Sequence, residues 1–119
     1  MTLSALQDAK EGLEALDTEK LLSAYHDTFL FEDPPSDQSI TDRSALKGYF
    51  QSLFGLPNTA FRDVRVHEAD TFAAIEWTWS GTSLSSGKPY HVRGASVIEV
   101  EEGKIARETL YYDPRAPLS

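Results

Sequence analysis

The first part of the chain carries hydrophobic side chains at helical spacing. An amphipathic helix is predicted over residues 3–15. Its apolar positions are Leu3, Leu6, Ala9, Leu13 and Leu16. Asp17 is suited to cap a short second helix. The apolar side of that helix carries Leu21, Leu22 and Tyr25. A third helix is expected after Thr41 or Asp42, because apolar residues then recur three and four positions apart. They are Leu46, Tyr49, Phe50 and Leu53.

From residue 61 onwards the pattern changes to a period of two, which predicts strands. Strands are expected around residues 64–67 and over residues 72–80, 90–100 and 105–113, with an earlier one at residues 29–33. Residues 34–39 and 81–88 are polar and predict loops. Gly103 occupies the positive-φ position of a hairpin turn. Helices followed by a meander of strands predict an α+β domain, with helices on one face of an antiparallel sheet.

Composition narrows the possible partners and location. A length of 119 residues predicts a single domain, and the net charge of -8 disfavours nucleic acid and anionic membranes as partners. No stretch approaches the roughly 20 apolar residues that a membrane-spanning helix needs. The first residues lack the features of a signal peptide, so a cytoplasmic protein is expected. The absence of cysteine excludes disulfides, thiol nucleophiles and thiolate metal sites.

The first predicted strand ends abruptly at two acids and two prolines. Alternation places Phe29, Phe31 and Asp33 on one face, and Pro34 ends the strand because it has no N–H for a sheet ladder. Asp33 therefore shares a face with two aromatic rings. It either ties down the turn that follows, as Asp often does, or is a poorly solvated carboxylate that acts as a base near neutral pH.

The order of these elements resembles the nuclear transport factor 2-like superfamily, and within it the SnoaL-like and ketosteroid isomerase-like branch. Three features carry the resemblance: Glu32-Asp33-Pro34 at the end of the first strand, the spacing from residue 33 to residue 57, and Gly103-Lys104-Ile105 opening the last strand. The resemblance covers about residues 4–113, leaving residues 114–119 as a loose tail. It implies a cystatin-like curved antiparallel sheet wrapped around three N-terminal helices, forming a cone with an internal pocket.

The resemblance also implies a role for Asp33. The matching Asp of ketosteroid isomerase is the general base that moves a proton between substrate carbons. The two oxyanion donors of that enzyme, a Tyr and a protonated Asp, correspond by spacing to Ala9 and to a position on or beside Ser96. Neither donor is kept, and losing such donors can raise the reaction barrier by several kcal/mol. The resemblance therefore supports the base and argues against steroid isomerisation itself.

Alternation within the strands predicts which side chains face the pocket. Ala73, Ile75, Trp77 and Trp79 form the apolar face of their strand and are either pocket lining or plain core. The candidate pocket residues are Tyr25, Phe29, Phe31, Tyr49, Phe50, Phe54, Ile75, Trp77, Trp79, Ser96, Ile98, Leu110 and Tyr112.

Glu108 is a second candidate catalytic residue. The family register turns it inward, and a buried carboxylate needs a partner, so it either binds Tyr25 or Tyr49 or takes part in chemistry. Asp33 and Glu108 could divide the acid and base roles, provided that both carboxyl groups lie on the same side of the sheet. A tyrosine hydroxyl could then donate to the developing oxyanion.

Charged residues on the remaining strand positions are expected on the outer face. Arg93 and Glu99 would lie there near Glu76, and the alternative is that Arg93 reaches round the sheet edge to bind an anionic ligand group. His26 is expected on a helix surface or at the pocket mouth. The histidines lack the spacing of a metal site, so neither a metal nor a cofactor is predicted.

Three functions remain open on the sequence. The first is a cofactor-independent isomerase, cyclase, dehydratase or hydrolase that acts on a small apolar cyclic or carbonyl compound with Asp33 as base. The second is a non-catalytic module that binds an apolar ligand or a partner protein. The third is a structural dimer whose pocket is filled by its own side chains. Under the family resemblance, a homodimer would form through the outer face of the sheet.

Overall fold

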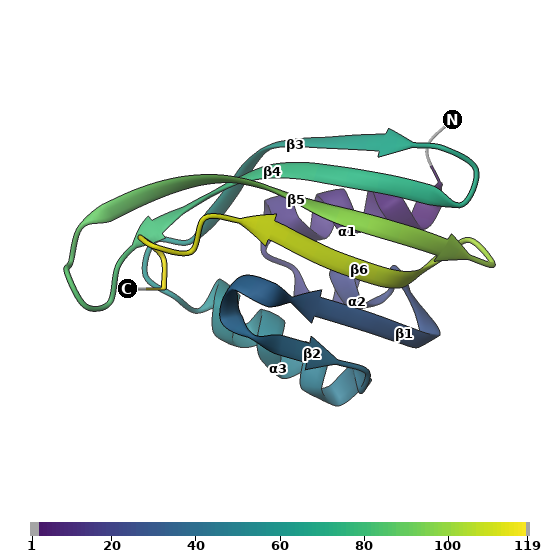
Figure 1. The fold of residues 1–119 in the computed structure, drawn as a ribbon, viewed down its shortest axis with the longest axis horizontal. Helices are drawn as coiled ribbons and strands as arrows, with labels where there is room; N and C mark the ends of the chain where they lie inside the picture. Colours follow the sequence, from purple (N-terminus) through teal and green to yellow (C-terminus); the bar gives the residue numbers. More distant parts are fainter. Residues whose placement is uncertain (1–2, 119) are drawn as a thin grey trace.

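The computed structural model describes residues 3–118. Three helices pack against one face of a six-stranded curved sheet that does not close into a barrel (Figure 1). The helices are α1 (Ser4–Ala15), α2 (Thr18–Leu22) and α3 (Arg43–Phe54). Within the described residues, none of the helices is long and apolar enough to cross a membrane.

Acidic side chains cap two of the helices. Asp17 accepts a hydrogen bond from the Lys20 amide at 3.1 Å, which confirms the predicted start of α2. Asp42 accepts from the Ala45 amide at 2.9 Å, which resolves the choice between Thr41 and Asp42. These caps satisfy amides that have no partner inside the helix. Helix α3 therefore has a defined start, and its Tyr49 is carried to the site described below.

The strands are β1 (Tyr25–Asp33), β2 (Gln38–Ile40), β3 (Ala60–Glu68), β4 (Phe72–Thr82), β5 (Pro89–Glu101) and β6 (Lys104–Tyr112). A short 3-10 turn, η1 (Pro34–Ser36), connects β1 to β2. The order across the sheet is β2-β1-β6-β5-β4-β3. Strands β1 and β6 run parallel, and the other neighbouring pairs are antiparallel. The first strand thus lies beside the last one.

Three details of the secondary-structure prediction were wrong. The sheet is mixed, because β1 and β6 run parallel. Part of the predicted loop at residues 34–39 belongs to β2, which pairs with the end of β1 through Asp33 and Gln38. Tyr25 and His26 lie in β1 and not on a helix. Strand pairing with residues far along the chain overrode the short helical pattern at residues 21–25.

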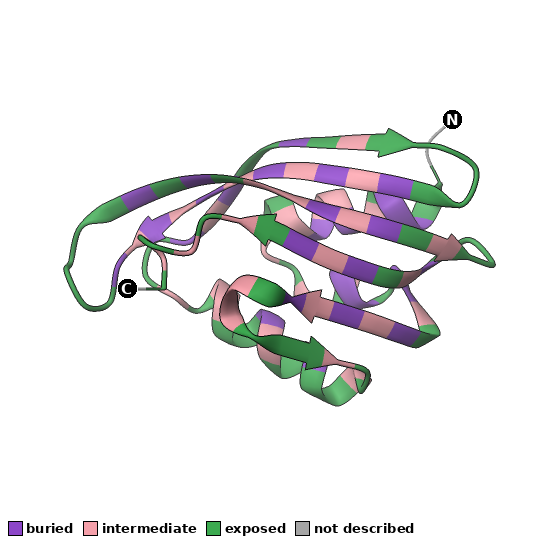
Figure 2. Cartoon of the chain, in the orientation of Figure 1, coloured by how far each residue is buried: buried purple, intermediate pink, exposed green. Residues whose placement is uncertain are grey.

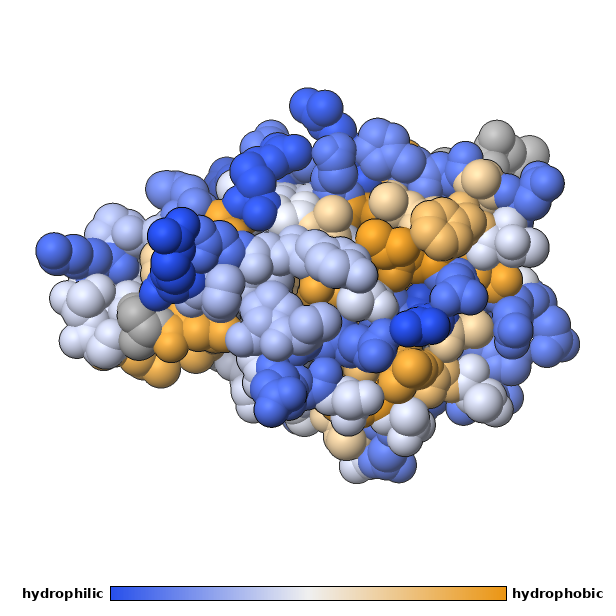
Figure 3. Space-filling model, in the orientation of Figure 1, coloured by the Kyte–Doolittle hydropathy of each residue, from blue (hydrophilic) through white to orange (hydrophobic). Residues whose placement is uncertain are grey.

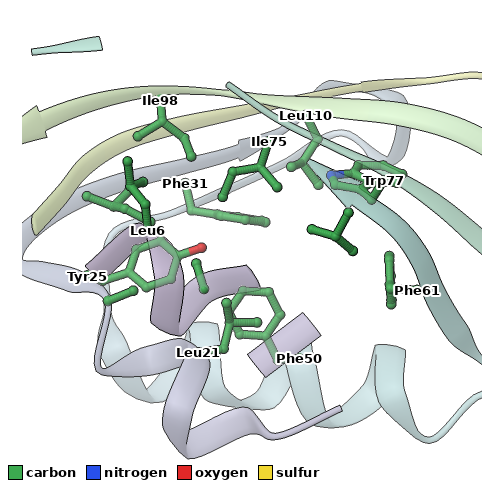
Figure 4. Packing of buried hydrophobic residues seen from close by; sticks show 14 of the residues in the cluster. Leu6, Leu21, Tyr25, Phe31, Phe50, Phe61, Ile75, Trp77, Ile98 and Leu110 are labelled. Carbon is green, nitrogen blue, oxygen red and sulfur yellow. The ribbon is translucent and has the colours of Figure 1, made fainter. Parts of the chain in front are cut away.

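Alternation along the long strands is confirmed. On β4, Ala73, Ile75, Trp77 and Trp79 are all buried against the helices, while the residues between them are more exposed (Figure 2). The same alternation turns Ser96 and Ile98 of β5 inward, and Glu108 and Leu110 of β6. The buried face of the sheet and the helices form one hydrophobic core. Figure 4 shows its central side chains pointing toward one another.

The outer face of the sheet mixes charged and apolar side chains (Figure 3). The carboxylate of Glu76 lies 3.5 Å from the guanidinium of Arg93 and 3.1 Å from the imidazole of His67. The predicted outer-face position of Arg93 is therefore confirmed. Arg107 pairs with Glu32 at 3.1 Å and with Glu99 at 3.7 Å. These partly exposed ion pairs belong to the solvent side of the sheet, away from the core.

Candidate functional site

A small cavity lies between the concave face of the sheet and the helices. Its volume is about 40 Å³, enough for a few waters or a small chemical group. Aromatic and aliphatic side chains dominate its walls, and none of the lining residues is Lys, Arg or His. The lining residues are Ala9, Leu13, Leu21, Tyr25, Phe31, Tyr49, Phe50, Leu53, Phe61, Ile75, Trp77, Trp79, Ser96, Glu108, Leu110 and Tyr112.

Most of the candidate pocket residues lie in this lining. Phe29, Phe54 and Ile98 do not line it: Phe29 and Ile98 are buried in the core, and Phe54 packs against it. The candidate list left out five lining residues. They are Ala9, Leu13, Leu21, Leu53 and Phe61. Four of them belong to the apolar helix faces that the sequence pattern predicts, so helical spacing could have found them. Phe61 lies in β3 ahead of a register shift that disturbs the simple alternation.

A wider groove opens beside the cavity, with a volume of about 460 Å³. It is lined by Asp33, by residues of β2 and α3, and by Leu118 near the end of the described chain. Four residues line both hollows, and we call them the throat. They are Tyr49, Leu53, Trp79 and Tyr112. A ligand that extends from the groove into the cavity must pass between these side chains.

Asp33 lies at the throat and is almost completely buried, with 2% of its surface exposed. The Tyr49 hydroxyl donates to Oδ2 at 2.6 Å, and the Tyr112 hydroxyl donates to Oδ1 at 3.0 Å and to Oδ2 at 3.2 Å. Within residues 3–118, Asp33 forms no ion pair with a basic side chain. Two tyrosine hydroxyls are therefore the hydrogen-bond partners of the Asp33 side chain among the described residues. Their hydrogen bonds offset the free-energy cost of burying the carboxyl group.

The two throat tyrosines remain protonated donors. Burial raises the pKa of Tyr49 far above its ordinary value, and the charge and hydrogen bond of Asp33 raise it further. The pKa of Tyr112 is raised by the same causes in the same order. A phenolate beside a buried carboxylate would be repelled by it, so both tyrosines keep their protons and donate hydrogen bonds to Asp33.

Glu108 forms a second polar cluster at the inner end of the cavity. It is 7% exposed, and the Tyr25 hydroxyl donates to its Oε1. Burial raises the pKa of Glu108, while hydrogen bonds from Tyr25 and Ser96 oppose that rise. Ser96 also accepts a hydrogen bond from the Trp77 indole N–H at 3.2 Å. The expected contact between Glu108 and Tyr25 is confirmed.

Asp33 and Glu108 both point to the buried side of the sheet, so the geometric condition for a shared role is met. Phe31, two residues before Asp33, is the cross-strand partner of Glu108. Each carboxyl group has its own tyrosine partners, and the two environments differ. Carboxyl groups in unlike surroundings can serve as base and acid in one reaction. Ala9 and Ser96, which the family resemblance places on or beside the positions of the two oxyanion donors, also line the cavity.

The remaining candidates lie outside the cavity. His26 is held by Glu102 at 2.9 Å, and Arg93 is paired with Glu76 on the outer face. In the described part of the chain, no group of three or more acidic or histidine side chains is arranged to hold a metal ion.

Comparisons with known proteins agree with this architecture. A protein from Catenulispora acidiphila with a ketosteroid isomerase-like fold, solved in complex with trimethylamine, has a TM-score of 0.83 at 15% identity; the match covers 99% of this chain and 92% of that one. A proposed polyketide cyclase from Pseudomonas putida has a TM-score of 0.81 at 18% identity, covering 98% and 95%. A proposed isomerase from Bacillus subtilis has a TM-score of 0.74 at 23% identity, covering 93% and 85%.

At these identities the solved structures establish the fold and leave the activity open. No curated protein matches the sequence significantly. The family profile described as the SnoaL-like domain matches residues 6–108, a range that includes both Asp33 and Glu108. The chain therefore belongs to the SnoaL-like domain family.

Proposed function

We propose that this protein is a cofactor-independent acid–base enzyme that acts on a small, largely apolar carbonyl or cyclic compound. The observation that carries the proposal is the setting of Asp33. Its buried carboxyl group lies at the throat between cavity and groove, with two hydroxyl donors and, among residues 3–118, no ion-pair partner. A carboxylate so placed can take a proton from a bound molecule without competition from a fixed cation.

Glu108 is proposed as the complementary acid. It lines the inner cavity, and its raised pKa favours the protonated form in this buried site. In an isomerisation, Asp33 would remove a proton from one carbon, and Glu108 would deliver one to another atom. Release of the proton from Asp33 to solvent and uptake of one by Glu108 would then restore both groups. Relatives in fold include the proposed polyketide cyclase and the proposed isomerase, and both reaction classes move protons on carbon skeletons.

The sizes of the two hollows limit the substrate. Only a small group fits the inner cavity of about 40 Å³ without movement of its walls, while the groove of about 460 Å³ can hold a larger part of the molecule. The walls of the cavity carry no basic side chain, so a substrate that needs an anion-binding cation there is disfavoured.

Proton abstraction can be tested before the substrate is known. A panel of small cyclic ketones is incubated with the protein in D₂O, and exchange of the protons next to the carbonyl is followed by NMR. The wild type is expected to accelerate exchange for part of the panel, and Asp33→Asn is expected to abolish the acceleration while keeping the fold. Asp27→Asn is the matched control, because Asp27 lies on the same strand with its side chain fully exposed. Equal exchange rates for wild type and Asp33→Asn across the panel would contradict the proposal.

A second candidate function is non-catalytic binding of a small organic cation. Eight aromatic rings and Glu108 line a cavity that has no basic side chain, and aromatic walls attract ammonium groups. The Catenulispora acidiphila relative in fold was solved with trimethylamine. Calorimetric titration with tetramethylammonium tests this candidate. Binding that survives Asp33→Asn and weakens in Glu108→Gln would favour it over the enzyme.

The homodimer also remains a proposal. Phe72 and Tyr111 are 50% and 57% exposed on the outer face of the sheet, where the partner copy is expected. Sedimentation velocity of wild type and Tyr111→Glu tests the assembly, with Leu84→Glu as a control in the β4–β5 loop. Sedimentation of the wild-type protein as a monomer at high concentration would contradict the proposed homodimer.

A further inference from the structure

One buried donor in the throat has no hydrogen-bond partner. Among the buried side-chain nitrogen and oxygen atoms of the described residues, Nε1 of Trp79 is the one without a hydrogen bond. The residue is 4% exposed, so bulk water does not compensate for the missing bond. Buried indole N–H groups usually find an acceptor, and an orphaned one calls for an explanation.

Trp77 provides the internal comparison. It lies on the same strand and the same face, two residues earlier, and it is equally buried. Its indole N–H donates to Ser96 at 3.2 Å. The two tryptophans therefore differ in whether the protein itself supplies an acceptor. The indole N–H of Trp77 has an acceptor within the protein, whereas that of Trp79 is left without one.

The position of Trp79 connects this donor to the candidate base. Trp79 lines both the cavity and the groove, and its ring contacts that of Tyr112 edge to face, with centroids 5.7 Å apart. Tyr112 in turn donates to Asp33. A molecule held in the throat can therefore contact both the indole of Trp79 and the tyrosine that donates to the base.

The other donors at the site are already engaged. The hydroxyls of Tyr49 and Tyr112 donate to Asp33, and the hydroxyl of Tyr25 donates to Glu108. These bonds would have to break before a tyrosine could donate to a ligand oxygen. The indole N–H of Trp79 needs no such exchange, because it has no bond to lose.

We propose that the indole N–H of Trp79 donates a hydrogen bond to an oxygen of the bound substrate, and that the substrate therefore carries a carbonyl or similar acceptor at the throat. This inference rests on the proposed function. Because the nitrogen is buried, the acceptor must enter between the throat side chains instead of approaching from bulk solvent.

The donor has a defined part in the proposed reaction. Asp33 takes the proton from the carbon next to the carbonyl, and the electrons of that C–H bond form a carbon–carbon double bond. The carbonyl π electrons move to the oxygen, which becomes an enolate. The indole N–H stays bonded to Trp79 and donates to this oxygen, where negative charge has developed. Returning the proton to a carbon restores the carbonyl and the Asp33 carboxylate.

The chain contains two tryptophans, so a ¹⁵N-labelled sample gives two indole signals. Trp79→Phe and Trp77→Phe assign them independently, so the assignment survives if one variant fails to fold. The probe is cyclohexanone, and methylenecyclohexane is the matched control with the same ring and no oxygen. Cyclohexanone is expected to move the Trp79 indole proton downfield and the Trp77 signal much less, whereas methylenecyclohexane moves neither downfield.

Affinity gives a second measurement. Loss of one neutral hydrogen bond predicts that Trp79→Phe weakens cyclohexanone binding by roughly threefold to tenfold, with little change for methylenecyclohexane. Trp77→Phe removes an N–H that has a protein acceptor, so it should not discriminate between the two probes. Equal weakening for both probes in Trp79→Phe would show loss of packing and overturn the assignment.

The result separates this inference from the proposed enzyme. A downfield Trp79 signal in a protein that does not exchange ketone protons supports the donor and refutes the catalyst. Exchange that depends on Asp33 with a Trp79 signal that does not move supports the catalyst and refutes the donor. An unmoved signal would mean that the N–H points at a neighbouring ring, such as that of Tyr90, whose centroid lies 5.4 Å away.

Discussion

The hydroxyl of Tyr112, in the last strand, lies 3.0 Å from Oδ1 of Asp33 at the end of the first strand. The two residues are 79 positions apart in the sequence. They meet because β1 and β6 are neighbours in the sheet, so the ends of both strands reach the throat. The hydrogen bonding of the candidate base therefore depends on a contact between the first and the last strand of the domain.

Removing a tyrosine hydroxyl that donates to Asp33 should destabilise the fold. Tyr49→Phe is expected to lower the free energy of unfolding by about 1–3 kcal/mol, because a buried carboxyl group loses a donor. Tyr112→Phe should cost less, since the Tyr112 hydroxyl donates over longer distances, 3.0 and 3.2 Å, than the 2.6 Å of Tyr49. Tyr111→Phe, on the exposed outer face, should change stability by less than about 0.5 kcal/mol. Urea unfolding measures all three. The interpretation fails if Tyr49→Phe costs no less in an Asp33→Asn background than in the wild type.

Glu108 should make stability fall as the pH rises. Burial raises its pKa in the folded protein, so the folded state keeps a proton that the unfolded chain releases near pH 4.5. The contribution of Glu108 is complete below that value and is lost as the pH rises through the raised pKa, by at most about 1.4 kcal/mol per pH unit. Glu108→Gln should remove this loss, so its stability relative to wild type should increase with pH.

Glu32 is the control for this pH dependence, because its pKa shifts the other way. A hydrogen bond from Thr109 and the neighbouring Arg107 lower the pKa of Glu32. Its contribution is present above the unfolded pKa and is lost as the pH falls through the folded value. Chemical unfolding from pH 3 to pH 8 should therefore show opposite trends for Glu108→Gln and Glu32→Gln. Parallel trends would exclude the electrostatic explanation.

A methyl group at position 94 should disturb the cavity wall. A Cβ built on Gly94 would lie 2.4 Å from the ring of Trp77, its cross-strand partner. Gly94→Ala is therefore expected to lower stability by about 1–3 kcal/mol through overpacking. A Cβ on Gly48 in α3 would meet nothing within 4 Å, so Gly48→Ala should raise stability by roughly 0.5–1 kcal/mol. Thermal unfolding that ranks these variants in the reverse order would contradict the packing at Trp77.

The cap of α3 gives a local test of the fold. Asp42→Ala should cost about 1 kcal/mol, because the Ala45 amide loses its acceptor. Thr41→Ala should change stability by less than about 0.5 kcal/mol, since Thr41 is exposed and Asp42 provides the cap. Denaturation curves of the two variants check the difference. Equal costs would mean that Thr41 shares the capping role.

The amino-acid sequence by itself determined which segments are helices or strands and which face of each segment most side chains lie on. Helical spacing located the three helices, and a period of two turned Trp77, Trp79, Ser96 and Glu108 inward, because these periods follow from the geometry of each local segment. The turn at Gly103 was also predictable, since φ is +75° there and glycine adopts that conformation without strain.

Only the tertiary structure decided how the elements meet. Tyr25 pairs with Glu108 across 83 positions, and it lies on a strand that its local sequence does not indicate. The parallel pairing of β1 with β6 and the throat beside Asp33 likewise depend on strand neighbours far apart in the chain. The unpartnered indole of Trp79 could not be read from a pattern, because whether a donor finds an acceptor depends on the three-dimensional positions of side chains from several elements.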